Sequence, residues 1–192
     1  MALTRFPREQ YASLELNQVA FPTTGMVVSQ VPLDAAFTAE TPCENGMWVV
    51  ADKAAITIKA PAAATDKPIG IVYTSEKEYD IMHYGLKTFG RKIGGDYPRV
   101  GILGVGDTVT TNCFQYDSST YGTIAALETA LKAAEAGTTP MYVVPGVGAA
   151  GVNKAVPALT TSKPGSGIYG KVVKYYTVPN GEKGIKYQII SL

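Results

Sequence analysis

The stretch from Asn45 to Ser75 reads NGMWVVADKAAITIKAPAAATDKPIGIVYTS, and it decides the fold class. It opens with Asn-Gly and carries Trp48, the single tryptophan of the chain, in an apolar run. Ile56 and Ile58 then alternate with polar residues, which is the period of a half-buried strand. A second apolar run, PIGIVY, follows after an alanine-rich loop. Two strands, a loop and a third strand in this order predict a β-rich core.

The composition around this stretch is that of one well-cored domain. The chain has 192 residues, of which 46% are apolar. Only 17% are charged, below the roughly 25% that is usual for soluble domains. No apolar run reaches the ~18 residues that a membrane span needs, so no membrane partner is predicted. The low charge favours either surface shared within an assembly or an ordinary surface rich in Thr, Gly and Ser.

Charge is unevenly distributed along the chain. The net charge of +1 argues against a general affinity for nucleic acid. Residues 137–192 nevertheless contain six lysines and one acidic residue, a net charge of +5, whereas residues 1–136 have a net charge of −4. Such polarity suits head-to-tail packing of subunits or docking on a partner of opposite sign. The alternative is that the asymmetry has no function.

The cysteine and histidine content predicts neither a disulfide framework nor a metal site. Cys43 and Cys113 are far apart and belong to no CxxC pair, which indicates thiols in a core and synthesis in a reducing cytoplasm. With His83, the chain offers three Cys or His ligands, too few to close a structural zinc site without carboxylates.

Residues 1–44 differ from the rest of the chain. Prolines at positions 7, 22, 32 and 42 interrupt short apolar clusters, so the segment is too broken for a helix and too apolar for a disordered tail. It is predicted to be an extended arm lying across a surface, either this domain's own or a neighbour's. Residues 45–192 are then the β-rich domain.

One helix is predicted near residues 120–136. Ile124, Leu127, Leu131 and Ala134 fall on one face, and Gly137 is well placed to end the helix. The chain closes with a predicted β-hairpin that turns at Asn180-Gly181. Residues 99–111 are interpreted as strand, glycine turn and strand, residues 141–144 as a short strand, and residues 145–167 as a loop. The predicted fold class is mainly β (α+β): a compact β-barrel or sandwich-like domain with one covering α-helix, an extended N-terminal arm and a C-terminal β-hairpin.

No complete catalytic or cofactor motif is found. The GxGxxG match at residues 146–151 is flanked by Pro145 and Pro157, and no acidic residue for a ribose lies between Glu135 and Glu182. The glycine spacing at residues 85–92 lacks the Lys-Ser/Thr pair of a P-loop. His83 is the single histidine for a nucleophile–base pair, and no GxSxG elbow is present. A non-enzymatic protein with no catalytic, cofactor-binding or metal-binding residues is therefore predicted.

Tyrosine is the residue type that points to binding. The chain has 12 tyrosines against five phenylalanines, and tyrosine suits interfaces because it combines a large ring with a polar tip. The predicted interface residues are Phe6, Tyr11, Phe21, Tyr175, Tyr176 and Tyr187. The alternative for the tyrosines of the final hairpin is a place in a barrel wall.

Two segments resemble structural proteins of tailed bacteriophages. The pattern NGMWVV at residues 45–50, followed by KPIGIV at residues 67–72, is similar to capsid decoration (cement) proteins, in which a glycine-led strand and a P-x-G-[IV]-V strand recur in a compact barrel. RVGILGVGD at residues 99–107, with TTN at residues 110–112, resembles phage virion proteins. The proline-broken N-terminal arm fits the same class.

The resemblance implies a protein on the capsid exterior that is made in the bacterial host cytoplasm. Its partner would be the major capsid protein, a homo-oligomer is kept open, and no nucleic acid partner is expected. It would bridge neighbouring subunits and strengthen the head, with no cofactor and no catalytic residue. One alternative is a structural protein of the tail or baseplate. The other is a small cytoplasmic ligand-binding or enzymatic β-barrel with a pocket near His83.

Overall fold

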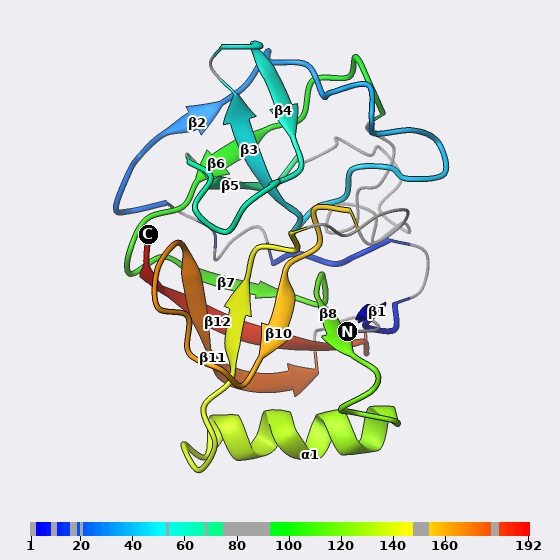
Figure 1. Cartoon of the computed structure of the whole chain (residues 1–192), viewed down its shortest axis with the longest axis vertical. Coiled ribbons are helices and arrows are strands. Elements are labelled where there is room, and N and C mark those ends of the chain that lie inside the picture. Colours follow the sequence, from blue (N-terminus) through cyan, green and yellow to red (C-terminus); the bar gives the residue numbers. More distant parts are fainter. Residues whose placement is uncertain are drawn as a thin grey trace.

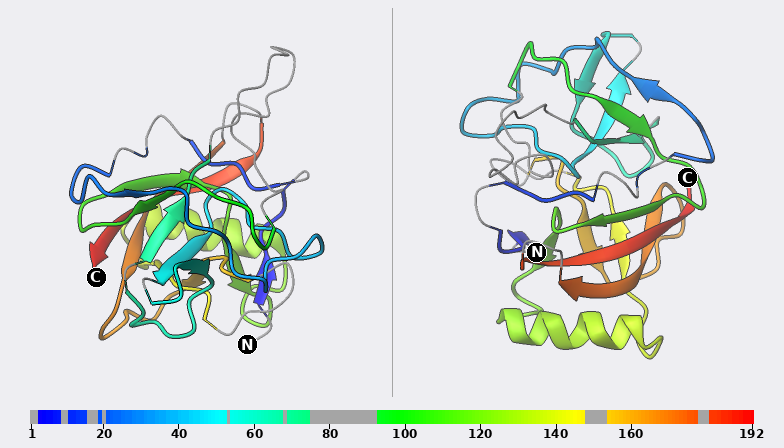
Figure 2. Two further views of the ribbon diagram at one scale, coloured as in Figure 1. Left: turned by 90° about the horizontal axis from the view of Figure 1, so that it is seen from above. Right: turned by 180° about the vertical axis from the view of Figure 1, so that it is seen from behind.

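The computed structural model describes residues 3–8, 11–15, 19, 21–52, 54–67, 69–74, 93–147, 154–177 and 181–192. These residues form two curled β-sheets, one above the other, with helix α1 across the far end of the lower sheet (Figure 1). The view from behind shows the same stacking (Figure 2). We call the two sheets the upper barrel and the lower barrel. The mainly β fold class with one helix is thereby confirmed for the described residues.

The upper barrel has strand order β2-β6-β5-β3-β4. Its strands are β2 (Val27–Val28), β3 (Trp48–Asp52), β4 (Thr57–Lys59), β5 (Ile69–Val72) and β6 (Val100–Ile102). The lower barrel has strand order β1-β8-β10-β9-β11-β12-β7. Its elements are β1 (Leu3–Arg5), β7 (Thr108–Thr111), β8 (Gln115–Asp117), α1 (Ile124–Glu135), β9 (Tyr142–Val144), β10 (Ala158–Thr160), β11 (Tyr169–Thr177) and β12 (Lys183–Ser191).

Chain connectivity forces the lower sheet to curl. Strands β7 and β8 are five places apart in the strand order, which would separate them by about 24 Å in a flat sheet. Residues 112–114 alone connect them, and a link of that length spans at most about 14 Å. The sheet therefore bends until its two ends approach each other, which makes it barrel-like.

The apolar stretch at β3 and β5 is continuous because both strands contribute to two cores. Trp48 and Val50 of β3 pack with Ile69 and Ile71 of β5 in the cluster that fills the lower barrel and the junction. The alternate side chains of the same strands, among them Val49, fill the upper barrel. Strands buried on both faces have little need of polar residues, in contrast to half-buried strands.

The N-terminal segment lies across the chain's own surface and completes both barrels. Strand β1 pairs with β8, Leu14 forms a bridge with Thr111, and Phe6 stacks on Phe114 with ring centroids 4.4 Å apart. Strand β2 pairs with β6 in the upper barrel. A boundary at residue 44 therefore does not separate an arm from a domain, because the side chains of residues before 44 are part of both cores.

The predicted helix and hairpin are confirmed. Helix α1 begins after Thr123, whose side-chain oxygen accepts a hydrogen bond from the Ala126 backbone N–H, and Gly137 follows it with φ +76°, the left-handed conformation that favours glycine. The helix buries Leu127 and Leu131 against the lower barrel. Strands β11 and β12 form the C-terminal hairpin.

Residues 99–111 form a strand, a glycine turn and a strand, as predicted. The two strands, β6 and β7, belong to different sheets, so the turn is the crossover between the barrels. One feature of the lower barrel differs from the prediction. Strand β10 lies within residues 145–167, which were predicted to be a loop. It pairs in parallel with β8 and antiparallel with β9.

Cys43 and Cys113 are both buried thiols, as predicted. Burial raises the pKa of Cys113 to about 12, although the nearby Arg5 opposes the shift. Among the described residues no helix is long and apolar enough to cross a membrane. In the same residues, no group of three or more Cys, His, Asp and Glu side chains is placed to hold a metal ion.

Candidate binding surface at the open end of the upper barrel

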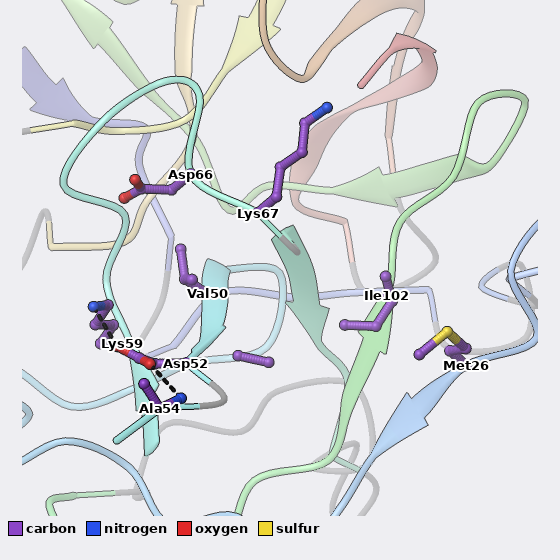
Figure 3. Close-up of a pocket in the computed structure, with 9 residues that line it drawn as sticks. Met26, Val50, Asp52, Ala54, Lys59, Asp66, Lys67 and Ile102 are labelled. Carbon is purple, nitrogen blue, oxygen red and sulfur yellow. Dashed lines mark hydrogen bonds and ion pairs between the residues drawn. The ribbon is translucent and has the colours of Figure 1, made fainter. Parts of the chain in front are cut away.

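The upper barrel is open where β3 and β6 end and β2 begins. Two adjoining pockets of about 680 and about 260 Å³ lie there, and they share Met26, Ala51, Asp52 and Ile102. Figure 3 shows Met26 and Ile102 on one side of the larger pocket and Asp52 with Lys59 on the other. We define the mouth surface as the residues that line the smaller pocket: Met26, Val28, Val31, Ala51, Asp52, Ile56 and Ile102.

The mouth surface keeps apolar side chains in contact with solvent. Met26 is 51% exposed, and Val27 beside it on β2 is 41% exposed. Ile102, in contrast, is buried within the pocket wall. Single exposed apolar residues are normal on proteins, but apolar side chains gathered around a pocket indicate a place where another molecule binds.

Ile56 is the most informative residue of this surface. It lies at the turn between β3 and β4, is 65% exposed, and has φ +51°. A β-branched residue in the left-handed region is strained by about 1–3 kcal/mol, and glycine or asparagine is the usual choice at such a turn position. Neither local geometry nor burial explains an isoleucine here.

The neighbouring turn is held by a charged rim. The Asp52 carboxylate accepts hydrogen bonds from the Ala54 and Ala55 backbone N–H groups and pairs with Lys59. These contacts, the Lys59 hydrogen bond first, lower the pKa of Asp52 to about 2, so its charge persists at all moderately acidic pH values. The pKa of Lys59 is raised, chiefly by Asp52 with smaller contributions from Asp66 and Asp34. Asp34, Asp52 and Asp66 thus lie around Lys59, and a second lysine, Lys67, lines the same pocket, so the rim has three carboxylates and two lysines.

We expect Ile56→Gly to raise the free energy of unfolding by about 1 kcal/mol, because glycine adopts positive φ without strain. Urea unfolding of the two proteins measures the difference. Val27→Gly is the matched control, since it removes an exposed apolar side chain from a strand and should lower stability instead. If Ile56→Gly is less stable than the wild type, the isoleucine stabilises the isolated chain and needs no partner.

The structure places the six predicted interface residues mostly in the core. Phe6, Phe21, Tyr175 and Tyr187 are buried in the chain's own hydrophobic cluster. Their selection as interface residues is corrected for this reason, since a ring enclosed by its own chain has no surface to offer. Tyr11 and Tyr176 are half-buried.

Tyr175 and Tyr176 have raised pKa values for related reasons. Burial raises the pKa of Tyr175, and the hydrogen bond that its hydroxyl donates to Glu128 raises it further. Burial, with a smaller contribution from Glu15, raises the pKa of Tyr176 to about 12. Both hydroxyls therefore stay protonated near neutral pH. Neither residue belongs to the mouth surface.

Sequence reasoning missed Met26, Ile56 and Ile102 as binding residues. The one available signal was Ile56, a β-branched residue between two strand-forming runs, where a turn residue is expected. The alternation of Ile56 and Ile58 with polar residues led instead to its assignment to a strand. The motifs weighed for an enzymatic or ligand-binding function lie wholly or partly outside the described residues. His83 and the P-loop-like residues 85–92 lie outside the described residues, and the GxGxxG match is described only as far as residue 147.

Comparisons with known proteins add no relative: no family model, no curated protein and no solved structure matches the chain.

Proposed function

We propose that the protein is a non-enzymatic structural component of a tailed-phage virion, which binds the outside of the capsid and stabilises the head as a decoration protein. The observation that carries this proposal is the mouth surface, where a strained and exposed isoleucine stands beside an apolar pocket. A surface of this kind supports function by binding rather than by chemistry. The resemblance of residues 45–50 and 67–72 to decoration proteins supports the place on the capsid.

The architecture suits a passive brace. The two barrels share buried strands, so a load applied to one is transmitted to the other through packed side chains rather than through a linker. Trp48 of the upper barrel donates a hydrogen bond from Nε1 to the Tyr187 hydroxyl of the lower barrel at 2.8 Å. If many copies bind around a shell, modest contacts between each copy and the shell combine into a high overall avidity, because each bound copy raises the effective concentration of the next contact. The major capsid protein is the proposed partner, and no cofactor is required.

The test is binding to phage heads that lack the protein. We expect the purified wild-type protein, as produced in a bacterial cytoplasm, to sediment with such heads in a saturable manner and to raise the temperature at which they rupture. Heads that already carry the protein are the control, because their sites are filled. Binding to purified tails or baseplates with no binding to heads would contradict capsid placement and would favour the tail alternative.

A further inference from the structure

A second surface of the molecule gathers three lysines on one face of a hairpin. On the outer face of the β11–β12 hairpin, Lys174 stands directly opposite Lys186, and Lys171 stands opposite Gln188. The intervening residues, such as Val172 and Tyr187, are buried in the lower barrel. Like charges directly opposite each other on neighbouring strands are destabilising. We call Lys171, Lys174, Lys186 and Gln188 the lysine face.

None of the three lysines has an ion-pair partner within the described part of the chain. The same hairpin exposes two apolar side chains, Val173 at the bulge of β11 and Ile190 on β12, to 48% and 38%. The hairpin therefore exposes apolar groups to water beside the repelling positive charges of the lysine face. Both features lower the stability of the isolated chain, and both are relieved if an acidic surface with apolar groups covers the hairpin.

The mouth surface has the complementary character. Its exposed apolar residues, Met26 and Ile56, lie beside a rim on which three carboxylates, Asp34, Asp52 and Asp66, outnumber two lysines, Lys59 and Lys67. The mouth belongs to the upper barrel and the hairpin to the lower barrel (Figure 1). Two different surfaces of complementary character on one chain allow copies to bind head to tail.

We propose that the mouth surface of one copy binds the lysine face of a second copy. This inference rests on one part of the proposed function, namely that the mouth surface binds a protein. It identifies that protein as a second copy of the chain. The apolar side chains at Ile56 and Val173 would supply the buried centre of the contact, while the carboxylates of the rim face the lysines. A contact between two different surfaces joins copies into a closed ring if the rotation from each copy to the next returns to the first copy. Otherwise it joins them into an open chain. Either arrangement would link neighbouring copies over a shell.

The test uses two variants, each blocked at one end. Ile56→Asp places a charge in the mouth surface, and aspartate tolerates the left-handed backbone conformation better than isoleucine does. Lys174→Glu combined with Lys186→Glu reverses the charge of the lysine face. Val147→Asp is the matched control, because Val147 is an exposed apolar residue outside the mouth surface and the hairpin. Circular dichroism and thermal unfolding establish that each variant is folded.

Sedimentation velocity over a range of concentrations gives the outcome. We expect the wild type and Val147→Asp to self-associate, more weakly as salt is added, and each blocked variant to associate about tenfold or more weakly. An equimolar mixture of the two blocked variants should form a 1:1 dimer and nothing larger, because one intact mouth meets one intact lysine face. A mixture that stays monomeric, or a wild type that never associates, overturns the proposal. Retention of a DNA oligonucleotide by the lysine face of a monomeric wild type also overturns it.

The head-binding experiment separates this proposal from the proposed function. If the protein binds heads while the wild type and the mixture remain monomeric, the head-to-tail contact is wrong and the capsid role stands. If the mixture dimerises while the protein ignores heads, the contact stands and the capsid role is wrong.

Discussion

Replacement of Glu44 by glutamine is expected to lower the free energy of unfolding by about 3–5 kcal/mol, the range observed when one partner of a buried ion pair is removed. The Glu44 carboxylate is almost fully enclosed and lies 2.9 Å from the Arg5 guanidinium and 3.0 Å from that of Arg8. It also accepts a hydrogen bond from the Ala12 backbone N–H at 2.7 Å. Glutamine preserves the shape of the side chain, but it leaves two guanidinium groups facing a neutral amide.

Urea unfolding of the Glu44→Gln variant measures the effect, and the exposed Glu40→Gln is the matched control. The control removes one exposed negative charge without touching residues 3–15 and affects only a surface hydrogen bond from Thr38, so its unfolding midpoint should lie close to that of the wild type. We expect the Glu44→Gln variant to release residues 3–15 first, which limited proteolysis would detect as early cleavage near the N-terminus. Equal stability of the Glu44→Gln variant and the wild type would show that the ion-pair cluster contributes nothing to holding the segment.

The elements that could be predicted from the sequence are those whose signal is local. Helix α1 was predictable because its apolar spacing and the glycine after it depend on residues that are neighbours along the chain. The C-terminal hairpin was predictable because alternation along β12 marks one buried face. The short apolar run at β3 also indicated a strand, although its burial on both faces comes from two barrels that the sequence does not distinguish.

The remaining features depend on tertiary placement. The residue pattern of positions 99–111 predicts two strands, but no feature of these residues indicates that β6 and β7 belong to different sheets. The parallel pairing of β10 with β8 joins segments far apart in sequence. The cation–carboxylate cluster around Glu44 joins residues more than 30 positions apart. The mouth surface depends on the backbone angle of Ile56, and composition does not encode that angle.

The mouth surface and the lysine face share one physical property. Each lowers the stability of the isolated chain, the first through a strained backbone and solvent-exposed apolar groups and the second through like charges on neighbouring strands. The core buries large side chains and hydrogen-bonds the Trp48 indole, and its two non-glycine residues with positive φ, Phe21 and Ala155, are enclosed by packing that Ile56 lacks. Local rules broken on the surface of a well-ordered scaffold are expected where a protein binds something else.

Replacement of Trp48 by alanine is expected to lower the free energy of unfolding by about 3–5 kcal/mol through the cavity that it leaves. Trp48 is fully buried in the cluster that joins the two barrels, and its ring lies 5.8 Å from that of Tyr187. The junction between the barrels, rather than either barrel alone, loses this packing. We therefore expect one cooperative unfolding transition in the wild type and a broader one in Trp48→Ala, which urea unfolding followed by circular dichroism would detect.

The hydrogen bond across the junction can be separated from the packing by a double-mutant cycle. Tyr187→Phe removes the acceptor and leaves the Trp48 N–H buried without it, at an expected cost of about 1–3 kcal/mol. Trp48→Phe removes the donor and part of the ring. If the hydrogen bond couples the barrels, the double variant is more stable than the sum of the two single losses predicts, since both polar groups are then gone. Strictly additive losses would assign the coupling of the two barrels to apolar packing alone.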